Sequence, residues 1–201
     1  MESTTTPKLG DEFAEAMSYA AKLHATQTRK GGDIPYFGHL MSVSALVIEA
    51  GGSQTQAIAG LLHDAVEDQG GKPTLDEIES RFGSAVAKIV SECSDTDEVP
   101  KPPWRDRKER YIVHLRGASD DAVVVSLADK VDNARAILRD LRLHGDRLWQ
   151  RFNVKDPEQH LWYYRSLLAV FEERTDSWLV DELRYTVEQI AALVAGPTVG
   201  P

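Results

Sequence analysis

A histidine and three carboxylates stand together at the end of an otherwise apolar segment. His63 and Asp64 follow the run AIAGLL, and Glu67 and Asp68 come about one helical turn later. In a helix, residues four apart share a face, which would pair His63 with Glu67 and Asp64 with Asp68. Burying such groups is costly unless an opposite charge compensates them. Imidazole and carboxylate suit Mn, Fe, Co or Zn, so the segment predicts a divalent metal site. Solvated acids at a helix end are the alternative interpretation.

A second carboxylate lies within an apolar segment further along the chain. Asp129 follows the run VVVSLA, and Asn133 lies one turn later on the same predicted helix face. A buried carboxylate followed by this asparagine can supply one metal ligand and one hydrogen bond to a substrate. A helix with ion pairs through Lys130 and Arg135 explains the same residues equally well.

Two adjacent cations, Arg29 and Lys30, open a glycine-rich turn between two predicted helices. The turn continues through IPYFGH and leads to His39. Paired cations on a turn suit an anionic ligand, although a solvated basic loop would have the same composition.

The charge of the whole chain restricts what that ligand can be. The 201 residues include 23 basic and 32 acidic side chains, for a net charge of −9. This charge argues against general binding to nucleic acid or to anionic membranes. An anionic substrate would therefore need a bound cation or a local basic patch.

The cellular compartment can be predicted from the cysteine content and from the absence of targeting patterns. The single cysteine, Cys93, excludes an intrachain disulfide and favours a reducing, cytoplasmic environment. We see neither a basic-then-apolar signal nor a run of 18 apolar residues, so we expect neither secretion nor membrane insertion.

Hydrophobic residues recur with a helical period almost throughout, which predicts an all-α bundle with short connections. The expected helices cover residues 11–26, 39–50, 54–68, 74–82, 84–92, 104–116, 120–143, one from 156 onward and 176–194. Ser53 and Asp156 are expected to cap two of them, a capping box at Thr74 and Glu77 to open another, and Gly83 to end it.

One domain should account for nearly the whole chain, since this length can bury a sizeable core. We expect a single domain over residues 10–195, with disordered ends at 1–9 and 196–201. The proline-rich stretch 94–103 is predicted to be a surface loop within the domain.

Together these segments resemble the HD superfamily of metal-dependent phosphohydrolases, which has the pattern H…HD…D. Three longer motifs are similar to the hydrolase domain of the RelA/SpoT alarmone enzymes. They are HATQTRKGGDIPYFGH, AGLLHDAVEDQGGKPTLDEIESRFG and LADKVDNAR, in this order. The length is similar to that of the small stand-alone alarmone hydrolases. The resemblance covers roughly residues 10–175. It implies an HD-domain helical bundle, one Mn²⁺ or another divalent transition metal, and removal of the 3′-pyrophosphate from guanosine tetra- or pentaphosphate.

The resemblance also implies roles for individual residues. The metal ligands would be His39, His63, Asp64 and Asp129. Glu67 and Asp68 would orient and deprotonate the attacking water. The substrate side would hold Arg29, Lys30, Tyr36, Asn133 and Arg135. His24 opens the first of the three motifs, and no role is implied for it.

Two positions depart from the sequence motifs of the family. Where related sequences often read TDDK, Asp97 stands at the lysine position, and where they read ADKLYN or ADRLHN, Asp132 replaces the Tyr or His. Both changes make the surroundings of an anionic ligand more negative, although Lys101 or Lys130 could compensate. The metal ligands remain in place, but the exact substrate is left open.

Two other functions therefore stay open. One is an HD phosphohydrolase for another nucleotide, such as a deoxynucleoside monophosphate, a cyclic nucleotide or a phosphorylated dinucleotide cofactor. The Arg29–Lys30 turn and the EDQ word weigh against it. The other is a non-catalytic metal or nucleotide sensor, against which Glu67 and Asp68 weigh. In each case the expected partner is a small anionic nucleotide, without nucleic acid or membrane, and the oligomeric state is not predicted.

Overall fold

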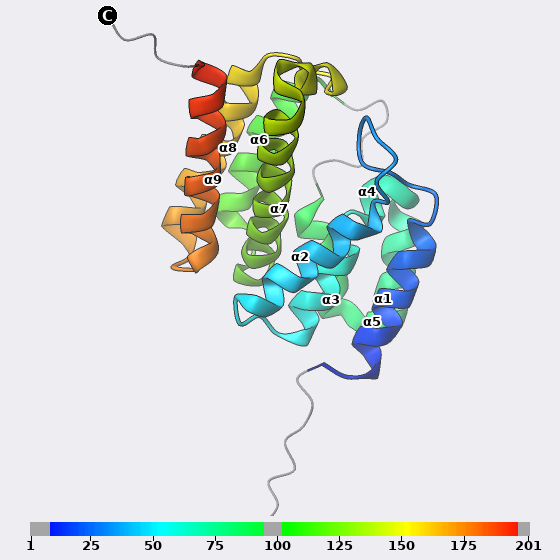
Figure 1. The fold of residues 1–201 in the computed structure, drawn as a ribbon. Helices are drawn as coiled ribbons and strands as arrows, with labels where there is room; N and C mark the ends of the chain where they lie inside the picture. The colour runs from blue at the N-terminus through cyan, green and yellow to red at the C-terminus, as the bar shows by residue number, and fades with distance from the viewer. Residues whose placement is uncertain (1–8, 95–101, 197–201) are drawn as a thin grey trace, which may run out of the picture.

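The computed structural model describes residues 9–94 and 102–196 (Figure 1). The described ranges form nine α-helices and one short 3₁₀ helix, with one isolated bridge, between Thr28 and Pro35, and no named strand. The elements are α1 (Asp11–Leu23), α2 (Phe37–Glu49), α3 (Gln54–Leu62), α4 (Ala65–Gln69), α5 (Lys72–Cys93), α6 (Trp104–Gly117), α7 (Asp120–His144), η1 (Gly145–Arg151), α8 (Pro157–Arg174) and α9 (Trp178–Ala195). The all-α prediction is confirmed.

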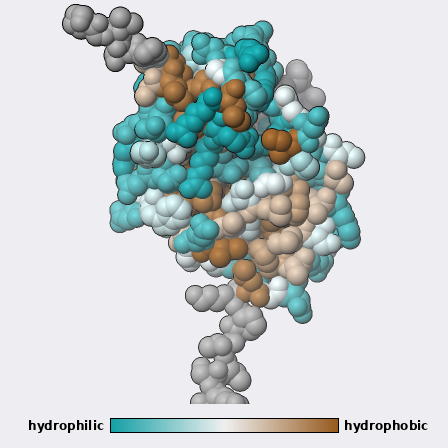
Figure 2. Space-filling view, in the orientation of Figure 1, coloured by the Kyte–Doolittle hydropathy of each residue, from teal (hydrophilic) through white to brown (hydrophobic). Residues whose placement is uncertain are grey.

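Some sequence predictions concern residues that the structure does not describe. The expectations for the two ends of the chain fall mainly on residues 1–8 and 197–201, and those for the proline-rich loop, with Asp97 and Lys101, fall on residues 95–101. All of these lie outside the described residues. Within the described part of the chain, no helix is both long enough and apolar enough to cross a membrane. On the face seen in Figure 2, hydrophilic residues are widespread and hydrophobic ones lie in separate patches.

Helix α7 is the central element of the fold. It contacts α2, α3 and α5 on one side and α8 and α9 on the other, and Figure 1 shows α6 to α9 as one group beside a second group formed by α1 to α5. Its buried stretch includes Val125, Leu127, Ala128 and Val131, which surround Asp129 in the sequence. The helix thereby carries a carboxylate into the junction between the two groups.

Short polar side chains fix where the helices begin. Ser53 caps α3 in a capping box with Gln56, and the Asp156 carboxylate accepts a hydrogen bond from the Glu158 amide at the start of α8. Ser119 caps α7 in the same way. These side chains satisfy amide groups that have no partner within the helix. The predicted caps at Ser53 and Asp156 are confirmed.

Several predicted helix boundaries are wrong, including the end of the first helix, which is at Leu23 and not at residue 26. The single helix expected over 54–68 is divided, because α3 ends at Leu62 and α4 begins at Ala65. The expected capping box at Thr74 does not form: α5 begins at Lys72, and the Thr74 hydroxyl instead donates to the Gln69 carbonyl at the end of α4. Gly83 interrupts α5 with a φ of 82°, which agrees with its predicted role as a helix stop.

Helices α2 and α3 approach each other closely at a glycine. A Cβ atom added at Gly60 would lie 3.2 Å from the Cα of Ser44 and 3.4 Å from its backbone nitrogen. The Ser44 hydroxyl also donates to the Ala57 carbonyl at 2.9 Å, which ties the same two helices together. The absence of a side chain at Gly60 thus sets the separation between the helix that carries His39 and the helix that leads into His63.

We therefore expect Gly60→Val to destabilise the protein by about 1–3 kcal/mol, the usual effect of overfilling a packed interior. Gly117→Val is the matched control, because a Cβ at Gly117 meets nothing within 4 Å. Denaturant unfolding followed by circular dichroism measures both. Equal stabilities of the two variants would contradict the close-packing argument.

Candidate metal centre and substrate cavity

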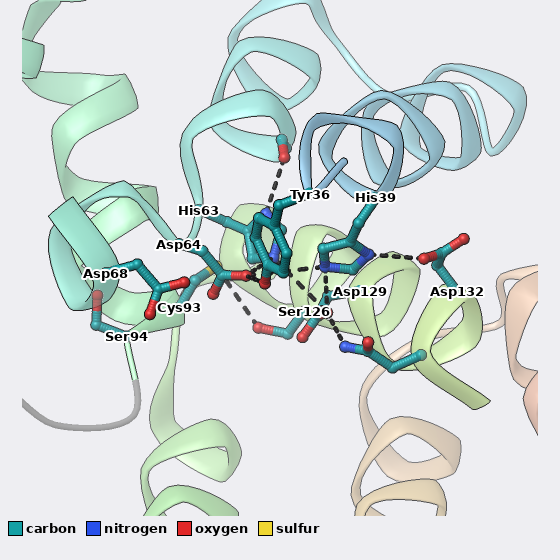
Figure 3. Close-up of polar contacts among 12 residues, drawn as sticks. Tyr36, His39, His63, Asp64, Asp68, Cys93, Ser94, Ser126, Asp129 and Asp132 are labelled. Atoms are coloured by element: carbon teal, nitrogen blue, oxygen red, sulfur yellow. Dashed lines mark hydrogen bonds and ion pairs between the residues drawn. The ribbon is translucent and has the colours of Figure 1, made fainter. Parts of the chain in front are cut away.

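Histidine and aspartate side chains from three parts of the chain converge where α2, α3 and α7 meet (Figure 3). One ligand atom each from His39, His63 and Asp129 lies within 4.8 Å of the others. The Asp129 Oδ1 atom is 3.2 Å from Nε2 of His39 and 3.6 Å from Nε2 of His63. Asp64 Oδ2 lies 3.1 Å from Nε2 of His63 and 3.8 Å from that of His39. The structure thus brings all four predicted ligands together.

The break between α3 and α4 lets two adjacent residues face this centre. In a continuous helix, neighbouring side chains point about 100° apart. His63 and Asp64 instead occupy the turn between the two helices, and Asp64 has φ −97° and ψ −1°. Glu67 and Asp68 consequently belong to a separate short helix. The prediction of one continuous helix for these residues is wrong, but the Asp68 amide still donates to the Asp64 carbonyl at 3.0 Å, one helical turn away, and Glu67 and Asp68 lie beside the same cavity.

The donor atoms fit a bound divalent cation. The Nε2 atoms of His39 and His63 are buried and have no hydrogen-bond partner among the described residues. The other ring nitrogen of each histidine is occupied: His63 Nδ1 lies 2.9 Å from the Gly60 carbonyl, and His39 Nδ1 lies 2.6 Å from the Asp132 carboxylate. Two imidazole nitrogens directed at two carboxylates form a ligand set typical of transition metals.

Electrostatics keep the carboxylates of the cluster ionised. Burial alone would raise the pKa of Asp129, but the ammonium group of Lys130, 2.5 Å away, and the two histidines hold that pKa well below its usual value. Burial would likewise lower the pKa of His63, but the Asp64 and Asp129 carboxylates raise it well above its usual value. A cation binds ionised carboxylates and neutral imidazoles, so binding here would release the proton of His63.

Tyr36 contacts two of the predicted metal ligands directly. Its hydroxyl donates to Asp64, and burial together with this carboxylate raises the pKa of the phenol. Its ring stacks on His24 at 5.7 Å and meets His39 edge-on at 5.3 Å. Tyr36 was predicted to lie on the substrate side. It does line the cavity, but its hydroxyl is bonded to Asp64.

A cavity of about 510 Å³ opens beside the centre. Of the residues with predicted roles, the cavity is lined by Arg29, Lys30, Tyr36, Asp64, Glu67, Asp68, Asp129 and Asn133. The lining contains seven basic and five acidic side chains, and four of the acids are Asp64, Glu67, Asp68 and Asp129. The negative charge of the cavity is therefore concentrated at the predicted metal ligands and α4, and the remaining wall is basic apart from Asp140, which pairs with Arg139 and Arg151. This is the local basic patch that an acidic chain needs to bind an anion.

Sequence reasoning missed several of these basic residues. The side chains concerned are Arg107, Lys108, Arg139 and Arg151. The run RDRKER in α6 is the visible signal for the first two, because it places cations between Trp104 and Tyr111, two aromatic residues that also line the cavity.

Arg29 is held beside the metal ligands by two neighbours on α7. Its guanidinium donates to Asn133 at 3.1 Å and lies 3.5 Å from the Asp132 carboxylate. Asn133 also donates to Asp129. A backbone hydrogen bond of 2.9 Å from Arg29 to Ile34 closes the turn. The predicted basic turn is thus attached to the helix that carries a metal ligand.

His24, for which the sequence suggested no role, supports Asp68 through a glutamine. The Gln27 amide donates to Asp68 at 2.7 Å, and the Gln27 oxygen lies 2.7 Å from His24 Nδ1 and accepts a further bond from Gln69. The buried His24 ring therefore fixes Gln27, and Gln27 fixes the carboxylate of Asp68.

One predicted substrate residue lies elsewhere. The Arg135 guanidinium donates to Glu182 of α9 at 3.0 Å, and Arg135 does not line the cavity. Arg135 is six positions after Asp129, about 120° around the helix, whereas Asn133 is within about 40°. Helix geometry thus separates Arg135 from the face that carries the site.

Comparison with known proteins places this site in a family. A model of the HD domain matches residues 16–156. The guanosine-3′,5′-bis(diphosphate) 3′-pyrophosphohydrolase MESH1 of Xenopus tropicalis is 37% identical over 145 residues, which cover 71% of this chain and 76% of that protein. MESH1 of Homo sapiens is 34% identical over 154 residues, 74% of this chain and 81% of that protein.

A solved structure gives the same result at the level of the fold. It is of a metazoan ortholog of SpoT that hydrolyzes ppGpp, and it matches with a TM-score of 0.74 and 28% identity over 92% of this chain and 98% of the other. The HD-domain match spans most of the sequence and includes all four converging histidines and aspartates, so this chain belongs to the HD-domain family.

Proposed function

We propose that this protein is a metal-dependent phosphohydrolase that removes the 3′-pyrophosphate of guanosine tetra- or pentaphosphate, leaving GDP or GTP. The observation that carries the proposal is the buried His–Asp cluster at the acidic part of an otherwise basic cavity. Relatives named for this activity, at 34–37% identity, support the substrate. We assign the activity to a single domain of residues 10–195 in the cytoplasm, where the lone Cys93 would stay reduced.

The cation would be held by His39, His63, Asp64 and Asp129, and we propose Mn²⁺. Carboxylates and imidazoles both accept this ion, and the two buried Nε2 atoms lack other partners among the described residues. When bound, such an ion lowers the pKa of water and neutralises charge on a phosphoryl group. Tyr36 keeps Asp64 in position through its hydroxyl.

Glu67 and Asp68 act on the attacking water. They lie on α4, directly after the His63–Asp64 turn, and both line the cavity. We assign to this pair the orientation of the water and the acceptance of its proton, with Gln27 fixing the Asp68 carboxylate. The water oxygen bonds to the phosphorus next to the ribose and the bond from that phosphorus to the 3′ oxygen breaks. Pyrophosphate leaves, and the 3′ oxygen stays on the ribose and takes up a proton to become the 3′-hydroxyl.

The basic wall receives the phosphates. Arg29 and Lys30 line the cavity on the turn after α1, and Asn133 fixes the guanidinium of Arg29. A substrate with two diphosphates carries charge at both ends, so it suits a cavity that combines a metal site with several cations.

The direct test is incubation of purified protein with Mn²⁺ and guanosine 3′,5′-bis(diphosphate), with products separated by anion exchange. GDP and pyrophosphate are expected. Release of orthophosphate alone, or activity on deoxynucleotides but not on this substrate, would favour an HD nucleotidase. Tight nucleotide binding without turnover would favour a sensor. Parallel reactions with Mg²⁺ and Zn²⁺ test the choice of metal.

Lys30→Gln is expected to raise KM about tenfold with little change in metal content, because it removes one charge-assisted contact to phosphate. Steady-state kinetics beside elemental analysis measure both quantities. Lys22→Gln is the control, since Lys22 is an exposed lysine of α1 that does not line the cavity. An unchanged KM for Lys30→Gln would remove Lys30 from the binding site.

A further inference from the structure

Asp132, one of the two positions that depart from the resemblance described above, contacts two parts of the site at once. Its Oδ2 atom is 2.6 Å from Nδ1 of His39 and 3.5 Å from the guanidinium of Arg29. We propose that Asp132 is a positioning residue that fixes the orientation of His39 for metal binding and attaches Arg29 to the same carboxylate. The inference rests on the proposed metal-dependent function.

Asp132 determines which nitrogen of the His39 ring carries the proton. A neutral imidazole carries one N–H, and an ionised carboxylate can only accept a hydrogen bond. A carboxylate beside Nδ1 therefore keeps the proton on that nitrogen and leaves the lone pair on Nε2, as in carboxylate–histidine–metal triads. The His39 side chain is 0% exposed, so water does not compete for Nδ1.

His63 shows the same arrangement with a different acceptor. Its Nδ1 atom lies 2.9 Å from the Gly60 carbonyl, and its Nε2 atom points toward the same carboxylates. Both histidines thus direct Nε2 into the centre (Figure 3). The acceptor of His63 is backbone and that of His39 is a side chain, so substitution of Asp132 disturbs one histidine and leaves the other as an internal reference.

The negative charge of Asp132 has to be reconciled with an anionic substrate. An additional carboxylate beside an anion-binding cavity should repel the substrate, but Arg29 and His39 both face this one. Arg29 is fixed from two adjacent residues of α7, through Asp132 and through the 3.1 Å hydrogen bond to Asn133. The negative charge of Asp132 is directed at a metal ligand and a cation. The presence of Asp132 at this position of the motif is therefore compatible with a phosphate substrate.

The test uses Zn²⁺ as a diamagnetic probe of the apoprotein. Zn²⁺ affinity is measured by competition with a chromophoric chelator, and ring protonation by histidine ¹H–¹⁵N correlation spectra of the Zn²⁺-loaded protein. Asp132→Ala is expected to weaken Zn²⁺ binding by about 10–100-fold, the scale for losing an orienting partner. The Nδ1–H signal of His39 should be lost to exchange, while that of His63 remains.

Two further variants make the result specific. Asp132→Asn keeps an oxygen that can accept from His39, so its loss of affinity should be smaller than that of Asp132→Ala. Asp121→Ala removes an aspartate of the same helix whose carboxylate contacts Gln56, and it should behave as wild type. The His63 signal and the Asn variant also show whether the fold is intact.

The outcomes separate this inference from the proposed function. An Asp132→Ala protein with wild-type Zn²⁺ affinity and an unchanged His39 signal would overturn the positioning role. A wild-type protein that binds no Zn²⁺ through His39 and His63 would overturn both proposals. Loss of affinity in Asp132→Ala, in a protein that leaves alarmones intact, would support the positioning role and overturn only the substrate.

Discussion

Replacing His63 with alanine is expected to remove the bound metal and with it nearly all hydrolysis. His63 supplies a buried Nε2 atom 3.1 Å from Asp64 and 3.6 Å from Asp129. Among the described histidines, only His39 belongs to the same cluster. Polarisation by a metal contributes several kcal/mol to the transition state, so turnover should fall by about 10³-fold or more. Elemental analysis and the rate should be measured on the same preparation.

His114→Ala is the matched control for this experiment. The His114 ring lies on the surface, 3.0 Å from the Glu92 carbonyl, and takes no part in the cavity. It should retain wild-type metal content and rate. Stoichiometric metal in His63→Ala would show that His63 is not a ligand and would remove the basis for the proposed centre.

Glu67→Gln is expected to lower turnover by about 10²–10⁴-fold while leaving the metal bound. The replacement is nearly isosteric and removes the charge of the group to which we assign the proton of the attacking water. Glu67 lies on α4, outside the four-residue cluster, so the ligands should remain in place. The rate and the metal content again have to be determined together.

Glu49→Gln, at the exposed end of α2, is the corresponding control and should change neither quantity. If Glu67→Gln lost its metal as completely as His63→Ala, Glu67 would be a ligand. The division of roles between the His63–Asp64 turn and α4 would then be wrong.

Most of the helices can be predicted from periodicity and capping residues, but the division between α3 and α4 cannot. The segment after Ser53 keeps a helical pattern through Asp68 and contains neither Pro nor Gly at the break. The turn at His63–Asp64 coincides with tertiary contacts, namely those of the two side chains with His39, Asp129 and Tyr36. A pattern of neighbouring residues contains no information about these partners, which come from α2, from the residue before α2 and from α7.

Prediction of the candidate site from the sequence is limited in the same way, because contacts between distant residues cannot be seen in it. The ligand residues could be proposed from their types and their order in the sequence. Asp132 was interpreted only as unfavourable charge, because its partner His39 is 93 residues away in the chain. Arg135 was placed with the substrate because it belongs to the same sequence motif as Asn133. Its angular position on the helix instead directs it to Glu182.

The ligands of the centre come from helices that are far apart in the sequence. A cation held by His39, His63 and Asp129 would act as a cross-link between α2, the end of α3 and α7, much as a disulfide joins distant segments. Because the ligands are assembled only in the folded chain, binding would stabilise that state in proportion to the logarithm of the free metal concentration. The resistance of this protein to unfolding would then follow the metal supply of the cell as well as its own packing.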